Sequence, residues 1–434
     1  MPNRLVRILR DANSLKRMAD EFKHLTPRDV TRPDVDRSGT RPRVFWVSHF
    51  LPYPAIGFGA LQRTHHLVRQ IAQRFEVHLF AVSDRTGEEQ NILDMGVAHC
   101  HLSLQKSRPE RLWAGVAGAI GPETYWERAF DHARLRDALR TAASGQSGVL
   151  LLDTLYLARY RDCAPHLPLV VTHHNIESDL TRQRATLRGG PSGAYLKRQG
   201  QLTVGLERRI SRAAALNLMV SPDDDARLRR LAGDVATCIV PNGVDVDYFR
   251  PDPAATRSPY SLVFAGGMDW FPNREAIQWL ASEIWPKLVA REPRRTLTVI
   301  GKAAPPEILA LAARDSRVTV AGFVPDIRPY LARASAYICP IRIGGGTRLK
   351  VLDALATGVP LLATALSVEG LGLTDGEHFL KADSADAMVA QLDRLDANPG
   401  LGDALSTAGR AFVSAGFSWD GIGERLATRL RDLR

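Results

Sequence analysis

Residues 344–353 read Gly344-Gly345-Gly346-Thr347-Arg348-Leu349-Lys350-Val351-Leu352-Asp353. An apolar run, 336–341, precedes this segment, and a helical pattern with its start at Thr347 follows it. The sequence therefore predicts a strand, a glycine-rich turn and a helix in direct succession. Units of this kind build the parallel sheets of α/β proteins.

The chemistry of this segment favours an anionic ligand. Three glycines remove side chains and let a ligand approach the backbone, and Thr347 is predicted to cap the helix. Free N–H groups at a helix start attract phosphate, and Arg348 and Lys350 add positive charge there. Asp353, three residues beyond Lys350, is placed to accept hydrogen bonds from a ribose diol. The alternative is a glycine turn with a Lys350–Asp353 surface pair, which at about 0.2–0.5 kcal/mol explains neither the glycines nor the two cations.

The same alternation of short apolar strands and helices extends in both directions from this segment. Two runs of strands are predicted, and a Pro-Asn-Gly turn at 241–243 with a proline-rich connector separates them. The predicted strands are 44–50, 77–82, 149–153, 169–173, 216–221 and 237–240 in the first half, and 261–266, 297–300, 318–320, 336–341 and 360–364 in the second. The pattern predicts two Rossmann-like α/β domains that face each other across a cleft, with ligands at the carboxyl ends of the strands.

Four segments follow from this division. Residues 1–42 are predicted to hold a basic amphipathic helix, 1–26, and a linker. Residues 43–243 and 244–415 are the two Rossmann-like domains, and 416–434 is a C-terminal segment. The helix could lie on an anionic membrane surface or dock on the protein's own domain, and the sequence leaves both open.

Three further loops carry candidate ligand-binding residues. His173 and His174 end a strand of the first half, where a histidine meets substrate or merely satisfies loop backbone. Gly57 and Gly59 form a G-x-G whose third glycine is replaced by Gln62, so we reject a nicotinamide site but retain a glycine loop that admits substrate. Gly266 and Gly267 follow the first strand of the second half, together with Asp269 and Asn273 as possible ligand contacts and Trp270 and Phe271 as packing residues.

Metal binding is not expected. The acidic cluster 223–225 follows Ser221-Pro222, where acids favour a helix start, and Asp245 and Asp247 follow the Pro-Asn-Gly turn, so both are predicted to be structural. Four cysteines, Cys100, Cys163, Cys238 and Cys339, are scattered without a C-x-x-C pair. This spacing opposes a zinc site or a disulfide framework and suits a reducing compartment.

The composition is that of a globular protein with an anionic partner. The chain has 434 residues, 45% hydrophobic content and a formal net charge of +10. No apolar run reaches the ~18 residues that span a bilayer, and the start of the chain lacks the apolar core of a secretory signal, so we expect a cytoplasmic protein. Charge alone motivates nucleic-acid binding, and no recognition motif supports it.

In this arrangement the sequence resembles the retaining glycosyltransferases with the two-Rossmann (GT-B) fold, often called family 4. The resemblance covers about residues 43–433. It rests on four segments in a fixed order, namely Pro-Asn-Gly-Val-Asp…Phe-Arg-Pro (241–251), Gly-Gly-Met-Asp-Trp-x-Pro-Asn (266–273), Gly-Phe-Val-Pro-Asp-Ile (322–327) and the glycine-rich segment 344–354 with the later Gly358-x-Pro360.

The resemblance implies a nucleotide-diphosphate sugar donor, usually UDP- or GDP-linked, on the C-terminal domain, an acceptor on the N-terminal domain, and no metal or cofactor. Carried over by position, Arg348 and Lys350 would face the diphosphate, and Asp353 would bind the ribose. His174 would touch the donor sugar, and Gly59 would lie beneath the diphosphate. The segment from Phe417 would cross back onto the first domain.

One position departs from the family pattern. The family's E-x7-E pair would place its first acid at 345, where this chain has Gly345. Backbone amides of Gly345, Gly346 and Thr347 would then hold the sugar hydroxyls. The implied function is retaining transfer of a sugar to a glycan or lipid-linked acceptor in exopolysaccharide, lipopolysaccharide or glycolipid assembly. Alternatives are a nucleotide-sugar epimerase on the same fold and a non-catalytic nucleotide-sugar-binding scaffold subunit.

Overall fold

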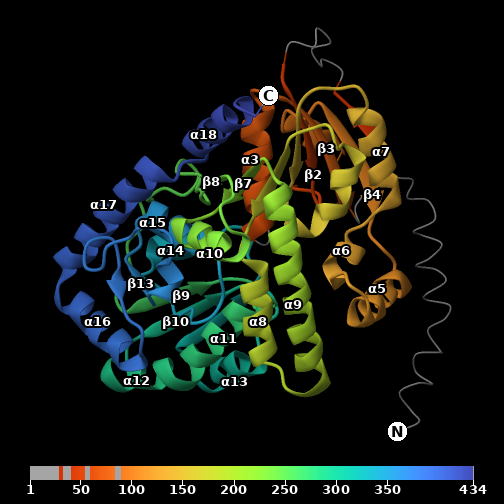
Figure 1. Ribbon diagram of the computed structural model, residues 1–434. Helices are drawn as coiled ribbons and strands as arrows, with labels where there is room; N and C mark the ends of the chain where they lie inside the picture. Colours follow the sequence, from red (N-terminus) through yellow and green to blue (C-terminus); the bar gives the residue numbers. More distant parts are fainter. Residues whose placement is uncertain (1–28, 33–40, 54–58, 84–88, 434) are drawn as a thin grey trace, which may run out of the picture.

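The computed structural model describes residues 29–32, 41–53, 59–83 and 89–433 (Figure 1). The predicted N-terminal helix 1–26, most of the linker that follows it and Gly57 lie outside these residues. Two α/β units make up the described chain, each built around its own sheet. They lie side by side, and the long helix α9 runs down the face of the first unit (Figure 1).

The first sheet has eight strands in the order β1-β4-β3-β2-β5-β6-β7-β8. Its strands are β1 (Asp29–Thr31), β2 (Arg43–Val47), β3 (Glu76–Ser83), β4 (His99–Leu104), β5 (Val149–Leu152), β6 (Leu169–His173), β7 (Leu216–Met219) and β8 (Thr237–Ile239). All neighbouring pairs are parallel except β1 with β4. The antiparallel edge strand β1 and the strand β4 were not among the predicted strands.

The second sheet has six strands, all parallel, in the order β11-β10-β9-β12-β13-β14. Its strands are β9 (Ser261–Ala265), β10 (Thr296–Ile300), β11 (Val318–Gly322), β12 (Ala336–Cys339), β13 (Leu361–Ala363) and β14 (Leu380–Lys381). The prediction of two separate parallel sheets flanked by helices is thus confirmed in its architecture.

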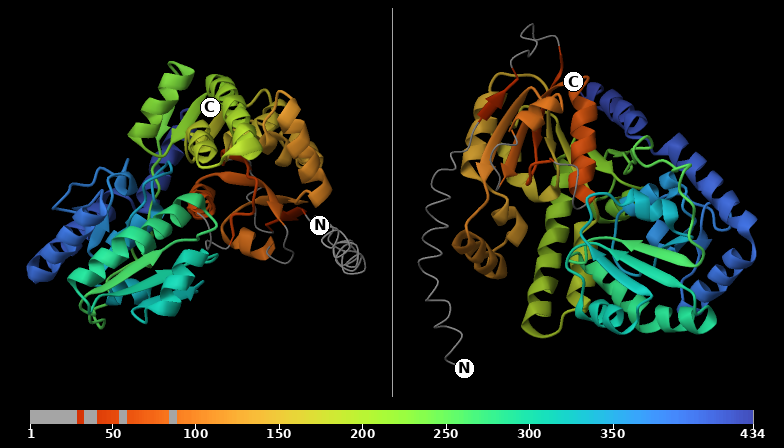
Figure 2. Two further views of the ribbon diagram at one scale, coloured as in Figure 1. Left: turned by 90° about the horizontal axis from the view of Figure 1, so that it is seen from below. Right: turned by 180° about the vertical axis from the view of Figure 1, so that it is seen from behind.

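Helices cover both faces of each sheet (Figures 1 and 2). Those of the first unit are α3 (Gly59–Ala72), α4 (Glu89–Asp94), α5 (Arg108–Ile120), α6 (Tyr125–Ala129), α7 (Ala133–Ala143), the 3-10 helix η1 (Leu155–Cys163), α8 (Glu177–Thr186), α9 (Gly190–Ala213) and α10 (Pro222–Ala232). Those of the second are α11 (Phe271–Trp279), η2 (Leu280–Ile284), α12 (Trp285–Arg291), α13 (Pro306–Arg314), α14 (Arg328–Arg333), α15 (Leu349–Thr357), η3 (Leu366–Val368), α16 (Ala385–Ala397), α17 (Pro399–Gly416) and α18 (Trp419–Arg431).

The cores explain why the strands are apolar without alternation. Strands buried on both faces need apolar residues at every position. In β2, Val44 and Trp46 pack on one face of the first sheet, and Phe45 and Val47 pack on the other. A single cluster fills the second unit.

The last helix, α18, packs on the first unit rather than the second. Its buried residues Trp419, Ile422, Leu426 and Leu430 recur at helical spacing and belong to the core that α3 also covers. The Trp419 ring stacks on His66 of α3 with centroids 4.8 Å apart. Figure 2 shows α18 beside α3, so the chain crosses back to the first unit after α17.

Two helix predictions need correction. The helix after the glycine-rich segment begins at Leu349, with Arg348 as N-cap residue, and not at Thr347. It ends at Gly358, whose φ of +76° suits glycine. The helix predicted over 274–290 is three consecutive pieces, because a π-helical turn, η2, separates α11 from α12. No helix among the described residues is long and apolar enough to cross a membrane.

Candidate functional site

Two helix starts meet in the cleft between the units. A Cβ atom on Gly59, the first residue of α3, would lie 3.1 Å from Leu349 Cδ1 at the start of α15. Gly59 is therefore needed for the close approach of the two units. Both helices direct the positive ends of their dipoles to this region, which favours an anionic ligand there.

The glycine-rich loop is packed against helix α8 of the first unit. The backbone N–H of Gly344 donates to Gln183 Oε1 over 2.7 Å, and Gln183 Nε2 donates to the Gly344 carbonyl over 3.2 Å. Gly346 has φ of +67°, and a Cβ there would lie 2.6 Å from Asn175 Oδ1. A side chain at Gly345 would point to Leu180. We expected the three glycines to let a ligand approach the backbone. In this structure they let the first unit pack closely against the loop.

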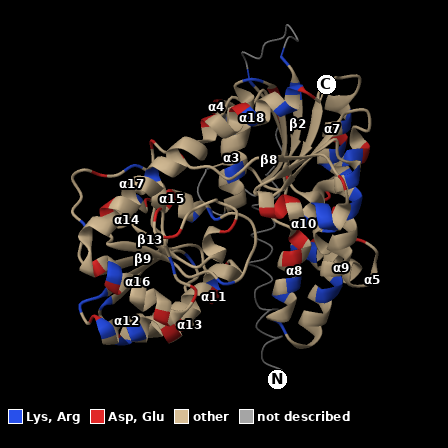
Figure 3. Ribbon diagram, turned by 60° about the vertical axis from the view of Figure 1, so that its left-hand side comes forward, with Lys and Arg blue, Asp and Glu red and all other residues tan. Residues whose placement is uncertain are grey.

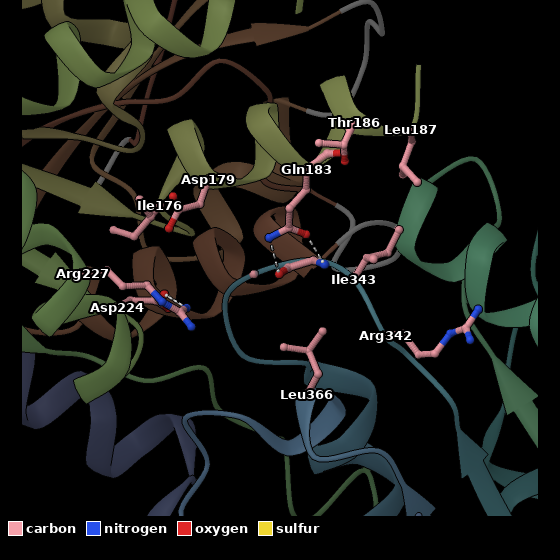
Figure 4. Close-up of a pocket in the computed structure, with 12 residues that line it drawn as sticks. Ile176, Asp179, Gln183, Thr186, Leu187, Asp224, Arg227, Arg342, Ile343 and Leu366 are labelled. Carbon is pink, nitrogen blue, oxygen red and sulfur yellow. Dashed lines mark hydrogen bonds and ion pairs between the residues drawn. The ribbon is translucent and has the colours of Figure 1, made fainter. Parts of the chain in front are cut away.

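A pocket of about 400 Å³ opens beside this loop. Figure 4 shows Gln183 pointing from α8 to the strand-like segment that contains Ile343, with Leu366 on the opposite side. Arg227 spans the cleft nearby, since it pairs with Asp224 on its own helix and with Glu369 of the second unit over 2.7 Å. Polar contacts on both sides of the loop thus join the two units in this structure.

Thr347 binds Asn242 of the Pro-Asn-Gly turn instead of capping helix α15 as predicted. Its hydroxyl and its carbonyl oxygen both accept hydrogen bonds from Asn242 Nδ2, at 2.9 and 3.1 Å. Asn242 Oδ1 in turn accepts from the buried Arg63 of α3, which also binds the carbonyls of Val240 and Pro241. The Pro-Asn-Gly turn is therefore the joint between the units and fixes the glycine-rich loop. Arg63 was missed because a helical arginine without a motif gives no signal in the sequence.

Arg348 is a buried cation with unused hydrogen-bonding capacity. The residue is 8% exposed, and its Nη1 donates to the Gly346 carbonyl. Within the described chain Arg348 Nη2 is buried and has no hydrogen-bond partner. Burial lowers the pKa of the guanidinium, and the more distant Glu369 opposes this shift. A buried, partly unsatisfied guanidinium is the group that binds phosphate or carboxylate.

Lys350 lies beside Arg348 and is held by Asn273. Lys350 Nζ donates to Asn273 Oδ1 over 2.6 Å, and Asn273 Nδ2 donates to the Gly267 carbonyl. The position of Gly266 admits no side chain, because a Cβ there would overlap Lys350 Nζ. Burial lowers the pKa of Lys350 to about 8. The predicted ligand contacts Gly266 and Asn273 thus position the lysine in this structure.

Asp353 lies on the same helix, one turn after Lys350. Burial raises the pKa of its carboxyl to about 8, and the positive charge of Lys350 opposes that shift. The alternative of an exposed Lys350–Asp353 pair does not fit, because Lys350 is bonded to Asn273 and both residues are partly buried. Asp269, the other predicted polar contact, forms an exposed ion pair with Lys302 at 3.0 Å.

The adjacent histidines His173 and His174 lie in different environments. His173 ends β6 as a fully buried residue, and its Nε2 bonds Asn217 Oδ1 over 3.0 Å. His174 lies one residue further, where its Nε2 is 3.5 Å from Asp153 Oδ1. Asp153 follows β5 and also accepts from Ser48 and Thr64. His173 is therefore structural, whereas His174 belongs to a polar group at the carboxyl ends of the strands.

A further histidine, His49, was missed. It follows β2, and its ring stacks on Phe130 with centroids 4.3 Å apart. Burial lowers the pKa of His49 to about 4, with Asp153 opposing and His174 reinforcing the shift. Its place after a strand of a parallel sheet was the available signal, the same one that pointed to His174.

Members of both acidic clusters make local contacts in this structure. Ser221 caps α10 by accepting from Asp224 N, and Asp225 pairs with Arg229. Asp245 Oδ1 accepts the backbone N–H groups of Asp247 and Tyr248, an Asx turn that leaves the connector folded. Trp270, predicted to be a packing residue, is instead 47% exposed.

One group of described residues has metal-ligand chemistry, and it lies outside the cleft. Ligand atoms of Glu76, His78 and His99 are within 4.8 Å of one another at the amino-terminal ends of β3 and β4. Glu76 Oε1 already binds His78 at 2.9 Å and Arg43 at 3.0 Å. Glu76 is thus engaged in an ion pair with Arg43 and in a hydrogen bond with His78, and burial lowers the pKa of His78 to about 4.

Comparisons with known proteins match a family model to each half of the chain. Residues 59–248 match the model "Glycosyltransferase Family 4", and residues 259–398 match the model "Glycosyl transferases group 1". The two matches meet at the connector and together span most of the chain. Each covers one of the two α/β units.

Two curated relatives are similar in sequence to about half of this chain. A GDP-mannose-dependent alpha-(1-6)-phosphatidylinositol monomannoside mannosyltransferase of Mycobacterium tuberculosis is 27% identical over 52% of this chain and 63% of its own length. A monoacylated-substrate counterpart in Corynebacterium glutamicum is 27% identical over 44% and 55%. The chain thus spans less than two thirds of these relatives.

Among solved structures, sucrose-phosphate synthase (tll1590) from Thermosynechococcus elongatus superposes with a TM-score of 0.69 at 19% identity, covering 91% of this chain and 99% of that one. Anabaena Alr3699/HepE in complex with UDP-glucose gives 0.63 at 14% identity over 90% and 99%. These likenesses concern the fold, which is the two-Rossmann arrangement.

Proposed function

Because this chain belongs to the glycosyltransferases of the group 1 and family 4 type, we propose that it transfers a sugar from a nucleotide-diphosphate sugar to a glycan or lipid-linked acceptor. The observation that carries the proposal is a pair of cations at the start of α15, of which Arg348 is buried and Lys350 is partly buried. Arg348 has an unused nitrogen, and Lys350 Nζ donates to the neutral amide of Asn273 and lies over the Phe264 ring. A diphosphate supplies the negative charge and the acceptor atoms that such a pair needs.

Transfer would depend on electrostatics and positioning. As the bond between the anomeric carbon and the diphosphate oxygen breaks, negative charge grows on the leaving group. Arg348, Lys350 and the dipole of α15 would stabilise that charge in a site shielded from water. His174, held near Asp153, would contact the donor sugar and stabilise it. Asp353 would bind the ribose, and Gly345, Gly346 and Thr347 would offer backbone groups to the sugar hydroxyls.

The finer features of the reaction belong to the same proposal. We infer transfer with retention of configuration from the resemblance to retaining enzymes. Catalysis without a metal ion fits two cations already placed at the predicted diphosphate site, and the acids of 223–225 and Asp245 are engaged in caps and turns. No cofactor other than the nucleotide-sugar co-substrate is needed, and action in the cytoplasm fits the scattered cysteines.

The donor and acceptor classes follow from chemistry and from relatives. Curated relatives are named as GDP-mannose-dependent enzymes that act on phosphatidylinositol mannosides, and a structural neighbour was solved with UDP-glucose. GDP-mannose is therefore the first donor to test, with UDP-sugars next. A lipid-linked acceptor in polysaccharide or glycolipid assembly suits the pocket between α8 and the glycine-rich loop, which is open to the surface.

A thermal-shift screen with nucleotide sugars and nucleoside diphosphates tests the donor. A ligand that binds the folded state raises the melting temperature by mass action. We expect one base to stabilise the protein as diphosphate and as sugar conjugate, and Arg348→Met to abolish the shift. Lys287→Met is the matched control, because Lys287 is an exposed lysine paired with Asp386 on the far helices.

The products then separate the candidate activities. Incubation of the stabilising donor with lipid extract should release nucleoside diphosphate and yield a glycosylated lipid or glycan. An epimerised sugar formed without acceptor would identify an epimerase instead. Binding without turnover on any extracted acceptor would identify a scaffold subunit. Failure of every nucleotide sugar to stabilise the wild-type chain would refute the proposal.

A further inference from the structure

Helix α5 exposes a continuous apolar face. Leu112 is 72% exposed, Trp113 70%, Val116 53% and Ile120 80%. Their spacing of one, three and four residues places them on one side of a helix that is about 20 Å long. Single exposed apolar residues are ordinary, but a cluster of large ones including a tryptophan marks an interaction surface.

The opposite side of α5 is firmly fixed, so this exposure is a property of the fold. Gln199 of α9 donates to the Gly118 carbonyl over 2.8 Å and accepts from Tyr125 N over 2.8 Å. A Cβ on Gly118 would lie 3.1 Å from Tyr125 N, so glycine permits the close contact with α6. Glu110 closes a capping box at the start of the helix. The apolar face is thus presented outward by a well-anchored helix.

Arginines lie at the two ends of the apolar face. Arg108 is exposed and lies one turn before Leu112 on the same side of α5. At the other end, Arg198 of α9 donates to the Gly121 carbonyl just past Ile120. Figure 3 shows further Lys and Arg along α9, and both basic and acidic residues along α8. An apolar strip with tryptophan, flanked by arginine, is the composition of helices that lie in an anionic lipid interface.

We propose that the α5 face, defined as Leu112, Trp113, Val116 and Ile120 with the flanking basic residues, docks the protein on an anionic bilayer. The apolar side chains would enter the boundary between head groups and acyl chains. Trp113 suits that depth because its ring is apolar and its N–H needs a polar partner. Arg108 and Arg198, at the two ends of the strip, would meet lipid phosphates. This site is separate from the predicted helix 1–26 and does not depend on the donor site.

The position of α5 relates the docked surface to the cleft. The α8–α9 hairpin lies between α5 and the second unit (Figures 1 and 2). The same hairpin supplies Asp179, Gln183 and Leu187 to the wall of the cleft pocket. Leu187, near the tip of the hairpin, is 53% exposed. Docking through α5 would thus keep one wall of the pocket close to the membrane, where lipid-linked molecules are found.

Vesicle co-sedimentation of the full chain tests this proposal. The probes are vesicles of phosphatidylcholine alone and of phosphatidylcholine with phosphatidylglycerol. The test variant replaces Leu112, Trp113, Val116 and Ile120 by serine, and all four are exposed, so the fold is expected to survive. The matched control carries Leu309→Ser and Phe323→Ser, two exposed apolar residues of the second unit. A third variant carries Leu5→Ser, Ile8→Ser and Leu9→Ser.

We expect binding to the anionic vesicles that weakens with salt and falls at least about tenfold in the α5 variant. The control variant should bind as the wild type does. Tryptophan fluorescence should shift to the blue with vesicles, and Trp113→Tyr should remove most of that shift. Circular dichroism and the nucleotide-induced melting shift should be the same in the α5 variant and the wild type, which keeps a folding defect apart from a docking defect.

Three results would overturn the proposal. Undiminished vesicle binding by the α5 variant is the first. Loss of binding in the Leu5, Ile8 and Leu9 variant alone would assign membrane contact to the N-terminal segment instead. Concentration-dependent dimerisation of the wild type, abolished by the α5 substitutions and unaccompanied by vesicle binding, would make the face a contact between two copies.

Discussion

The two sides of the cleft handle charge in different ways. On the C-terminal side, the buried Arg348 donates to a backbone carbonyl, and the partly buried Lys350 donates to a neutral amide. On the N-terminal side, Asp153 is a buried carboxylate that already accepts hydrogen bonds from Ser48 and Thr64, with His174 at 3.5 Å. The C-terminal side thus has cations that lack a counter-ion within the described chain and can bind an anionic ligand. On the N-terminal side, neighbouring side chains already bind the Asp153 carboxylate.

This difference suggests that the C-terminal side binds the anion and the N-terminal side contacts the sugar. Burying a cation without a counter-ion costs free energy, so its presence signals a partner that arrives from outside. A self-satisfied polar network holds a side chain in one orientation, which suits contact with a sugar rather than capture of an anion. We therefore expect substitutions on the C-terminal side to remove binding and those on the N-terminal side to remove turnover.

The largest expected effect comes from removing both cations. The double variant Arg348→Met with Lys350→Met should lose donor turnover by about a thousandfold or more, since each donor at a developing anion contributes about 3–4 kcal/mol. Its melting temperature without ligand should stay the same or rise, because two desolvated charges are replaced by apolar side chains of similar length. Steady-state kinetics measures the turnover, calorimetry with nucleoside diphosphate measures the loss of binding that underlies it, and a thermal melt measures the melting temperature.

Ligand binding should therefore be lost while the melting temperature of the free protein stays the same or rises. A variant that loses both binding and intrinsic stability would show that the cations are part of the structure rather than a site for an anion. Lys287→Met again serves as the control, and its affinity for nucleoside diphosphate should be that of the wild type.

The next effect concerns the N-terminal side. His174→Ala should lower turnover about a hundredfold, within the range for a positioned side chain that acts in the transition state. Affinity for nucleoside diphosphate should change less than about threefold, because the cations remain. Steady-state kinetics and calorimetry on one preparation separate the two effects.

His173→Ala is the paired control for this prediction. His173 is fully buried and bonded to Asn217, so its loss should reduce stability, with a lower melting temperature and little change in turnover per folded molecule. If His174→Ala instead weakened nucleoside diphosphate binding as strongly as the double cation variant, the proposed division between the two sides would be wrong.

The sequence predicted the layered fold well, for a physical reason. Strands such as 149–152 and 169–173 are buried on both faces and therefore appear as short apolar runs. Strand β4, His99–Leu104, was missed because polar residues interrupt its apolar run, and its two histidines contact Thr31 and Asp29 of the edge strand β1. The short strand β1 has no periodicity at all, and only its antiparallel pairing with β4 makes it a strand.

For the site, residue types were predictable and their partners were not. Glycines, Arg348 and Lys350 stand out in one segment, so local chemistry identified them. Arg63, Asn242 and Thr347 come from three separate segments and meet only in the folded chain. The helix start at Leu349 instead of Thr347 follows from this contact, because Asn242 holds the Thr347 hydroxyl that was expected to cap α15.

A smaller effect should appear in the pH dependence of donor binding. Lys350 carries its charge below its pKa of about 8 and loses it above. Asp353, with a pKa also raised to about 8, gains negative charge over the same range. Both changes oppose an anionic ligand, so affinity for nucleoside diphosphate should fall above about pH 8 by up to about tenfold per pH unit for each group.

Two conservative variants assign this pH dependence. Lys350→Arg keeps its charge at high pH and should flatten the lysine part of the decline, whereas Asp353→Asn should flatten the part due to the carboxyl. Calorimetry from about pH 7 to pH 9.5 resolves them. An unchanged profile in both variants would mean that neither group faces the diphosphate.

The smallest expected effect tests the contact between the two sides. Gln183→Ala removes both hydrogen bonds to Gly344 and leaves the cations and His174 in place. Each such bond contributes about 0.5–1.5 kcal/mol, and both bonds join α8 to the glycine-rich loop across the cleft. We expect KM for the donor to change by no more than about fivefold, with slightly faster release of nucleoside diphosphate. Stopped-flow measurement of release, with Arg182→Ala on the exposed side of α8 as control, would show it. A loss of turnover comparable to that of His174→Ala would mean that the loop must be held against α8 for the reaction itself, and the two sides would then act as one unit.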